Sequence, residues 1–403
     1  MKKPKLTESA AGPLGEDVRS DVHVHYRPGR TPLEIVVASK VDYLYGAAIA
    51  AAGRRAAAAF AVSSGHLEIN DQGALEWVLL ARLETCLRRA GFTGEPVLPE
   101  PAPGADAPRR RERLRRSRLY IPGNRPKLML SAGLYGADGL ILDLEDSVPP
   151  AAKDEARLLV RNALLALDWG GAERMVRINQ GVVGDDDLAA IAPCNPHLLL
   201  LPKVEEAAQV HHVAGRLREL LGGREAPFLM PILESPAGIF RAVEIAAADP
   251  SVVALTLGLE DLSAELGAPR TSEGWESFLA RSTTVYAARA AGVQPIASVF
   301  SDIRDEQALA QYVRRERSLG FDGIGCIHPG QIEVVHREMT PSEVEAERAV
   351  RIVRAAREAE AKGLGAVAVG SKMVDPPVVR QAFRTVELAM AGGVLAADWE
   401  SAG

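Results

Sequence analysis

Acidic and basic side chains close several short apolar runs in the second half of the chain, and their types suit chemistry on a carboxylated substrate. Carboxylates are oxygen ligands that Mg²⁺ accepts, and a guanidinium binds a carboxylate through two parallel hydrogen bonds. The pattern indicates an enzyme that acts on a carboxylic acid, provided that the fold brings the ends of these runs together. The charged residues at these positions are Asp143, Glu145, Arg177, Lys203, Glu234 and Asp261.

Eight short apolar runs carry these side chains at or near their ends. Each run is rich in leucine or β-branched residues and is separated from the next by a stretch of helical periodicity. Such runs are typical of parallel strands buried on both faces, and eight of them predict an α/β fold, a closed (β/α)₈ TIM barrel. The carboxyl ends of the strands then form one mouth, where we expect the charged residues to meet. The runs are Leu119–Ile121, Gly139–Leu142, Met175–Ile178, Leu198–Leu201, Phe228–Leu233, Val252–Leu257, Ile296–Phe300 and Gly323–Ile327.

Glu234 and Asp261 follow the fifth and sixth runs, so neighbouring strands would point two carboxylates into the same mouth. Two hard oxygen donors, with water and substrate completing the coordination, suit Mg²⁺. Simpler interpretations stay open, because Glu234 can begin a helix before Ser235 and Asp261 can be a surface carboxylate. Glu260 could also take the place of Asp261, since either residue could end that strand.

Arg177 lies inside an otherwise apolar run. A buried guanidinium is costly unless an anion pairs with it. The pattern therefore predicts either a contact with a substrate carboxylate or a structural ion pair with Asp143 or Glu145 on the adjacent strand. The residues alone leave both interpretations open.

The composition limits the classes of protein to which the chain can belong. Its 403 residues carry a formal net charge of −6, and 47% of them are hydrophobic, which is enough for one large core and a smaller one. This charge predicts no broad basic surface and no nucleic-acid partner. No apolar run approaches the roughly 20 residues that span a bilayer, and the three cysteines lie far apart, so we expect a cytoplasmic enzyme without a membrane partner.

A proline- and glycine-rich stretch at residues 93–108 marks the expected boundary between two domains, and the arginine run Arg109–Arg113 follows it. We place a small α+β domain at residues 1–94 and a solvated Pro/Arg-rich linker at residues 95–112. The barrel and a C-terminal helical segment are expected at residues 113–403.

Two strands and two helices are expected in the small domain. Residues 22–26 and 33–37 have the composition of strands paired around a turn at residues 27–30. A long alanine-rich helix is predicted to start near Val41. In a second predicted helix, residues 74–90, apolar side chains recur at helical spacing and indicate a core-facing stripe.

Short blocks of sequence, in order along the chain, carry a resemblance to a known family. They are Leu67–Leu75 and Ala81–Glu84 in the small domain and then Arg116–Asn124, Tyr135–Asp138, Asp143–Asp146, Lys153–Arg157, Val176–Asn179, Leu201–Lys203, Glu234–Gly238, Gly258–Leu262 and Gly370–Asp375. The first two resemble the acyl carrier (gamma) subunit of citrate lyase. The others resemble its beta subunit, a citryl lyase of the HpcH/HpaI aldolase/citrate lyase family. The chain is thus similar to a fusion of carrier and lyase.

The resemblance implies a Mg²⁺-dependent carbon–carbon lyase that cleaves a citryl thioester by retro-Claisen chemistry. In that reaction the tertiary hydroxyl loses its proton, the adjacent carbon–carbon bond breaks, and oxaloacetate forms while the acetyl thioester departs as an enolate. The implied ligands of Mg²⁺ are Glu234, which also contacts substrate, and Asp261. Arg177 would bind a substrate carboxylate and act in catalysis.

Further roles follow from the same resemblance. Asp143, Glu145 and Lys203 would orient the substrate-binding arginine or a metal-bound water. Arg116 is a weaker candidate for contact with substrate or with a carrier arm. Asp375 would supply the acid/base group from a neighbouring subunit, which implies a homo-oligomer with shared active sites.

Ser20 is the nearest match to the serine that carries a phosphoribosyl dephospho-coenzyme A arm in the carrier subunit, although residues 15–19 replace a shorter spacer of the family. A built-in carrier would work beside a separate citrate lyase alpha subunit, the acyl transferase. A second interpretation keeps the barrel but uses free malyl- or citramalyl-CoA thioesters and a vestigial carrier. A third, a non-enzymatic scaffold, is disfavoured by intact Glu234, Asp261 and Arg177.

Overall fold

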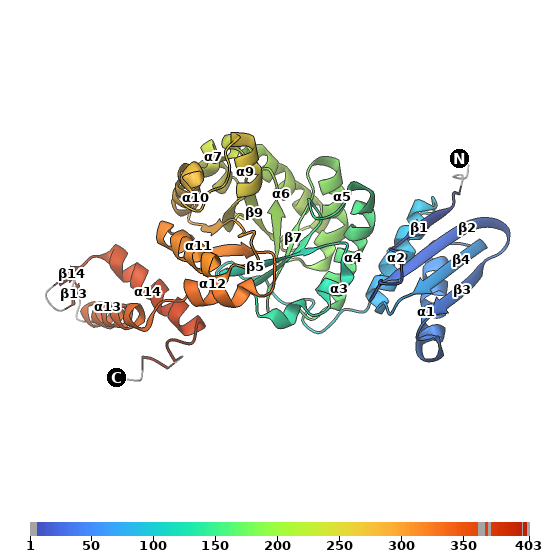
Figure 1. Cartoon of the computed structure of the whole chain (residues 1–403), viewed down its shortest axis with the longest axis horizontal. Coiled ribbons are helices and arrows are strands. Elements are labelled where there is room, and N and C mark those ends of the chain that lie inside the picture. Colours follow the sequence, from blue (N-terminus) through green and yellow to red (C-terminus); the bar gives the residue numbers. More distant parts are fainter. Residues whose placement is uncertain (1–5, 362–366, 370–371, 397, 401–403) are drawn as a thin grey trace.

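Three parts of the chain follow one another in the computed structural model (Figure 1). An N-terminal α+β unit lies at one end, a barrel in the middle, and a pair of C-terminal helices at the other end. The residues that the structure describes are 6–361, 367–369, 372–396 and 398–400. Gly370 and Ser371, which belong to one of the sequence blocks, lie outside the described residues.

A closed barrel of parallel strands forms the centre of the molecule (Figure 1). Its strands are β5 (Ser117–Pro122), β6 (Gly139–Asp143), β7 (Glu173–Arg177), β8 (Leu198–Leu201), β9 (Phe228–Leu233), β10 (Ala254–Leu257), β11 (Gln294–Ala297) and β12 (Gly323–Cys326). They pair in chain order, and β12 closes the barrel by pairing with β5. Inward-pointing side chains such as Ile141, Met175 and Leu200 fill the interior. The predicted (β/α)₈ barrel is confirmed.

Helices surround the barrel and connect its strands. They are α3 (Pro126–Met129), α4 (Lys153–Ala166), α5 (Gly181–Ile191), α6 (Ala207–Leu221), α7 (Pro236–Phe240), α8 (Ala242–Ala246), α9 (Leu259–Leu266), α10 (Phe278–Ala290), α11 (Glu306–Leu319) and α12 (Gln331–Met339), with short 3₁₀ turns at Ala132–Tyr135, Pro150–Ala152, Ala192–Cys194 and Trp275–Ser277. Their apolar residues recur at helical spacing. In α4, for example, Ala156, Leu159, Val160, Ala163 and Leu164 are all buried, so one stripe of the helix faces the core.

The N-terminal unit contains a four-stranded sheet covered by two helices. Its elements are β1 (Ser9–Ala11), β2 (Val22–Pro32), β3 (Glu34–Ser39), α1 (Asp42–Ala59), β4 (Ser64–Asp71) and α2 (Glu76–Arg89). The sheet order is β1-β2-β4-β3, so the predicted hairpin between the second and third strands is wrong. β4 lies between them, because its buried Leu67 and Ile69 alternate with more exposed residues and fit a half-buried central strand.

The N-terminal unit packs against the barrel through α2 and α4, and ion pairs are buried in this contact. Glu84 on α2 is fully buried, and its carboxylate accepts hydrogen bonds from Arg161 on α4 at 3.0 and 2.8 Å. Arg82 bonds with Asp21 at 3.0 and 2.9 Å and lies 3.0 Å from Glu155 of α4. Separating such pairs would leave buried charges unpaired, so these contacts hold the unit against the barrel.

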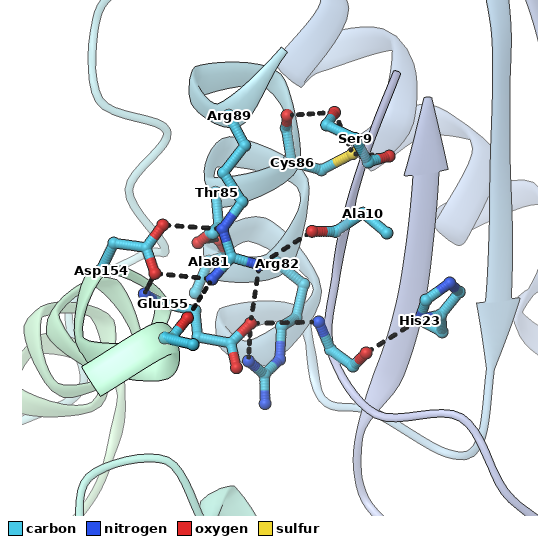
Figure 2. A network of polar contacts seen from close by, with 12 residues as sticks. Ser9, Ala10, His23, Ala81, Arg82, Thr85, Cys86, Arg89, Asp154 and Glu155 are labelled. Carbon is cyan, nitrogen blue, oxygen red and sulfur yellow. Dashed lines mark hydrogen bonds and ion pairs between the residues drawn. The ribbon is translucent and has the colours of Figure 1, made fainter. Parts of the chain in front are cut away.

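Another part of this contact lies at the first turn of α4 (Figure 2). Figure 2 shows Arg89 of α2 reaching Asp154 and Glu155 in the first turn of α4; Arg89 Nη2 lies 2.6 Å from Asp154 Oδ1. α4 follows the carboxyl end of β6, and the neighbouring Lys153 donates from Nζ to the carbonyl of Leu144 at 2.8 Å. The N-terminal unit therefore packs on the outer helix α4, and the part of this contact at the first turn of α4 lies toward the end of the barrel that carries the strand ends.

Most residues of the Pro/Arg-rich segment 95–112 are exposed, but the segment is not a free linker because two of its arginines bind the barrel. Arg109 and Arg111 lie at the face of the barrel opposite the mouth and donate to backbone carbonyls that precede strands. Arg109 Nη1 donates to the carbonyl of Glu225, just before β9, at 2.7 Å. Arg111 Nη1 donates to the carbonyl of Pro250, before β10, also at 2.7 Å. These arginines bind backbone carbonyls at the barrel floor. No pattern of charges in the sequence predicts such partners.

The C-terminal region consists of α13 (Glu343–Ala361), α14 (Pro376–Ala391) and the short strands β13 (Val367–Val369) and β14 (Lys372–Val374). α13 and α14 pack together around buried Val353, Val386 and Trp399. Figure 1 shows the pair projecting away from the barrel. Within the described ranges, no helix combines the length and the apolar composition needed to cross a membrane.

Candidate active site

Glu234 lies directly after β9 and points into a cavity at the carboxyl ends of the barrel strands. Its side chain is buried, with 5% of the residue exposed. Oε1 accepts a hydrogen bond from the backbone N–H of Lys203 at 2.6 Å. Lys203 has a φ of +52°, a left-handed conformation that is strained for a residue with a side chain. The loop after β8 thus adopts an unfavourable conformation where it anchors Glu234.

Asp261 lies in the first turn of α9, after β10, and faces the same cavity of about 440 Å³. The walls of this cavity also include Asp143, Asp146 and Arg177. Neighbouring strands therefore bring Glu234 and Asp261 together, as the spacing predicts. Glu260 is on the rim of the cavity too, but its carboxylate pairs with Arg270.

The electrostatics of the cavity disfavour an ionised Glu234 in the absence of a cation. Burial, together with the negative charges of Asp261 and Glu145, raises the pKa of Glu234 to about 8, against the hydrogen bond from Lys203 and the positive charge of Arg177. Two carboxylates that share a pocket repel each other, and a cation bound between them relieves this repulsion. The oxygen-only pair is therefore chemically suited to a hard divalent cation.

A complete protein-built metal cage is absent: the described residues contain no group of three or more His, Cys, Asp or Glu side chains that could hold a metal ion. Mg²⁺ commonly keeps several waters and takes only one or two carboxylates from the protein. A site with two carboxylates, in which water and substrate fill the remaining coordination positions, is consistent with this preference of Mg²⁺.

Arg177, at the end of β7, is fixed by carboxylates on two sides. Nε and Nη2 donate to the two oxygens of Asp143 at 2.6 and 2.7 Å, and Nη1 lies 3.0 Å from Glu145 Oε2. Burial alone would lower the pKa of Arg177, but the hydrogen bonds and charge of Asp143 more than offset it and raise the pKa. The ion pair considered from the sequence is present, and the same guanidinium also lines the cavity.

Glu145 connects Arg177 to Lys203. Lys203 Nζ lies 3.1 Å from Glu145 Oε1, and its side chain is partly exposed. Burial raises the pKa of Glu145, with Arg177 opposing this shift. The three residues predicted to orient the site, Asp143, Glu145 and Lys203, thus lie together with Arg177 at the mouth.

Arg116 is not part of this cavity. The structure therefore corrects the prediction that Arg116 contacts substrate. It precedes β5, at the floor of the barrel, and its guanidinium forms two hydrogen bonds of 2.9 Å with Asp138, which precedes β6. The amino ends of parallel barrel strands lie opposite the mouth. Arg116 therefore stabilises the barrel floor through this ion pair.

Asp375 and Ser20 also lie outside the cavity of their own chain. Asp375 is exposed at the residue before α14, and its carbonyl accepts from the N–H of Val378 at 2.9 Å. Ser20 is half-buried in the N-terminal unit with a φ of +58°, and its N–H donates to the carbonyl of Gln72 at 3.0 Å. Asp21, the next residue, belongs to the buried Arg82 pair at the contact with α4.

Sequence reasoning missed several residues of the cavity wall, among them Arg118 and Gly258. Arg118 precedes the first apolar run, so it was not counted within a strand, although β5 contains it. Gly258 was visible only as part of a family block. A Cβ at this position would lie 2.5 Å from Glu234 Oε2 and 2.7 Å from Glu234 Cβ, so the glycine makes room for the carboxylate.

Gly258→Ala is expected to weaken Mg²⁺ binding at least about tenfold, because the added methyl must displace Glu234. The φ of Gly258 is −103°, which any residue can adopt, so the effect falls on the carboxylate and not on the backbone. Calorimetric titration with Mg²⁺ measures it. Gly215→Ala in α6, where a Cβ meets no atom within 4 Å, is the matched control and should leave Mg²⁺ affinity unchanged. Equal Mg²⁺ affinity in both variants would contradict the placement of Glu234.

Comparisons with known proteins agree with this architecture. Residues 116–329 match the family model described as HpcH/HpaI aldolase/citrate lyase. Residues 11–90 match a carrier (ACP) family model described as malonate decarboxylase delta subunit (MdcD). The resemblance to a carrier fused to a lyase is therefore confirmed at the level of these two families.

Individual relatives are similar over most of their length. Citrate lyase subunit beta of Leuconostoc mesenteroides subsp. cremoris is 38% identical over 290 residues, 70% of this chain and 95% of that protein. The mitochondrial citramalyl-CoA lyase of Homo sapiens is 35% identical over 290 residues, 68% of this chain and 85% of that protein. The structure of CitE from Mycobacterium tuberculosis, in complex with magnesium, acetoacetate and coenzyme A, is 35% identical with a TM-score of 0.56; it covers 68% of this chain and 98% of that one.

The barrel, the carboxylate pair at its mouth and these matches define the class of protein: the chain belongs to the HpcH/HpaI aldolase/citrate lyase family. Within that family it is a citrate lyase beta-like carbon–carbon lyase with an N-terminal MdcD/ACP-like domain.

Proposed function

We propose that the protein cleaves a citryl thioester to oxaloacetate and an acetyl thioester, with Mg²⁺ as cofactor and the carrier-like domain supplying the thioester. The observation that carries this proposal is that Glu234 and Asp261 face one cavity beside Arg177. Both carboxylates would hold Mg²⁺, which when bound orients the hydroxyl and carboxylate oxygens of the substrate and stabilises negative charge in the transition state. Two oxygen donors in a partly buried pocket support this assignment.

Arg177 would position a substrate carboxylate at the mouth. Asp143 occupies one edge of the guanidinium with two hydrogen bonds, so the group is held in place before substrate arrives. A donor that is already fixed needs no rearrangement during the reaction, which is how such groups lower a barrier. Glu145 and Lys203 would keep this arrangement by bridging Arg177 to the loop after β8.

The acid/base step is assigned to Asp375 of a second copy of the chain. Its exposed position at the start of α14 is outside the cavity of its own barrel. The projection of α13 and α14 from the barrel in Figure 1 supports an exchange between copies, because these helices are available to cover a neighbouring mouth. The proposal therefore includes a homo-oligomer with shared active sites.

Ser20 is proposed as the attachment site of a phosphoribosyl dephospho-coenzyme A arm. Its neighbour Asp21 pairs with Arg82, which also pairs with Glu155 in the first turn of α4. This turn lies toward the end of the barrel that carries the mouth, which supports delivery of the arm to that end. A tethered arm raises the local concentration of substrate without new contacts. A separate citrate lyase alpha subunit would load the arm by acyl transfer.

The alternative is a lyase that acts on free malyl- or citramalyl-CoA, with a vestigial carrier. Two observations favour it. A relative 35% identical to this chain is a citramalyl-CoA lyase. The carrier-like unit is also held to α4 by the buried pair of Glu84 and Arg161, which restricts the movement that a shuttling carrier needs.

Intact-mass analysis and a cleavage assay distinguish the two functions. Full-length protein from its own host is expected to carry an added mass that Ser20→Ala removes, and to release oxaloacetate from a citryl thioester only with Mg²⁺. Unmodified protein that cleaves malyl- or citramalyl-CoA would favour the alternative. A protein that cleaves none of the three thioesters, in either carrier-bound or CoA form, would contradict the proposal.

The affinity for Mg²⁺ is expected to rise with pH. A protonated Glu234 must lose its proton before it can bind a cation, and its pKa of about 8 places this competition in the working range. The apparent dissociation constant should fall about tenfold per unit from pH 6 to 8 and level off above that. Calorimetry at pH 6, 7, 8 and 9 measures this dependence. A Mg²⁺ affinity that does not change with pH across this range would contradict the assignment of Glu234 as a ligand.

A further inference from the structure

A second arginine, Arg118, lies deeper in the barrel than Arg177 and has only neutral hydrogen-bond partners among the described residues. It is 1% exposed and lies near the start of β5. Nη1 donates to Met230 Sδ at 3.1 Å, and Nη2 donates to Thr256 Oγ1 at 3.2 Å and to the carbonyl of Ala297 at 3.5 Å. Nε is buried without a hydrogen-bond partner in the described part of the chain.

Several other buried arginines of the barrel have carboxylate partners. Arg115 donates to Glu173 at 2.7 and 2.8 Å, and Arg281 lies 3.2 Å from Glu316. Arg174 of β7 forms no ion pair among the described residues, but it donates to His197 and to the carbonyl of Ala105, at the floor of the barrel. A buried guanidinium with neutral partners keeps most of its desolvation penalty. Filling space does not explain Arg118, because a methionine of similar length would fill the interior without a charge. An anion that arrives with a ligand would explain it.

Arg118 lines the same cavity as the proposed metal ligands. Glu234, Asp261, Thr256 and Tyr120 share this cavity with it. Tyr120 lies two residues further along β5, so Arg118 is about 7 Å deeper along the strand at about 3.3 Å per residue. The cavity thus has carboxylates at its mouth and an unsatisfied cationic donor toward its base. A ligand that bridges the two ends needs a metal-binding group at one end and an anion at the other.

We propose that Arg118 binds the distal carboxylate of a dicarboxylic 2-oxo acid such as oxaloacetate, and that it selects dicarboxylic over monocarboxylic substrates. The inference rests on the proposed function, in which the other end of the oxo acid lies at Glu234 and Asp261. It also names the feature that separates the two candidate functions. Citryl cleavage yields a dicarboxylic oxo acid, whereas citramalyl and malyl cleavage yield the monocarboxylic pyruvate and glyoxylate.

Binding of oxaloacetate and pyruvate to the full-length protein with saturating Mg²⁺ tests the role of Arg118, because the two ligands differ only in the distal carboxylate. In Arg118→Met the dissociation constant for oxaloacetate is expected to rise about 10- to 100-fold, the range for a lost charge-assisted hydrogen bond. The constant for pyruvate should change less than about threefold. Arg118→Lys, which keeps the charge but loses the fork, should fall between wild type and Arg118→Met.

Arg115→Met is the matched control, since it removes another buried guanidinium from the barrel floor, away from the cavity. It is expected to lower the melting temperature and leave the preference for oxaloacetate over pyruvate unchanged. Equal effects of Arg118→Met on both ligands, or none on either, would overturn the inference. If wild-type protein with Mg²⁺ binds pyruvate and oxaloacetate equally, the inference about Arg118 is overturned but the proposed function is not. If neither oxo acid binds, the proposed function fails together with it.

Discussion

Glu234→Gln is expected to lower kcat/KM for Mg²⁺-dependent thioester cleavage by at least about 10³-fold, the scale of about 4 kcal/mol of transition-state stabilisation. The amide is a poor ligand for Mg²⁺, but its oxygen can still accept the hydrogen bond that the N–H of Lys203 donates to Glu234. The fold should therefore survive. Because the substitution also removes a carboxylate that burial penalises, the melting temperature should be equal to or above that of wild type.

Glu260→Gln is the control for this prediction. Glu260 is one residue from Asp261 and on the rim of the same cavity, but its carboxylate is mostly exposed and pairs with Arg270. Exposed pairs contribute little, so activity and Mg²⁺ affinity should stay within about twofold of wild type. Steady-state kinetics and Mg²⁺ titration of both variants measure the contrast. A Glu234→Gln enzyme that keeps wild-type activity would rule out Glu234 as a ligand.

Arg177→Met is expected to reduce both activity and stability. The substitution leaves the buried carboxylate of Asp143 without its two hydrogen bonds, and breaking such a pair costs about 3–5 kcal/mol of unfolding free energy. It also removes the guanidinium that is proposed to hold a substrate carboxylate. We expect kcat/KM to fall about 10²-fold or more, measured under conditions where the variant is folded.

Arg157→Met separates the two effects. Arg157 on α4 bonds with the buried Asp187 at 2.7 Å, but neither residue lines the cavity. This variant should lose stability in chemical denaturation and keep its kcat/KM. If both variants lost activity in proportion to stability, Arg177 would be a structural residue alone.

The barrel could be predicted from sequence because parallel strands buried on both faces are continuous apolar runs. Leu198–Leu201, for example, is fully buried and leaves no polar alternation to misread. The N-terminal sheet was harder to predict. β4 enters between β2 and β3 after the whole of α1, and such a non-local pairing has no signature in the spacing of neighbouring strands.

Some residues of the candidate site could likewise be predicted from the sequence, and others could not. Glu234 and Asp261 were predictable because the end of a barrel strand fixes where a side chain lies. Arg116 was misplaced because a position before a strand puts it on the floor beside Asp138. The contacts of Arg109 and Arg111 could not be predicted because their partners are backbone carbonyls, which every residue carries. Arg118 was missed because its environment is set by opposite strands of the barrel.

A crystal structure of the protein soaked with Mg²⁺ and oxaloacetate tests the central claim most directly. We expect one octahedral ion at the barrel mouth, coordinated by a carboxylate oxygen of Glu234, one of Asp261, oxygens of the oxo acid and water. An ion bound elsewhere, or both carboxylates turned away from an oxo acid in the cavity, would contradict the account.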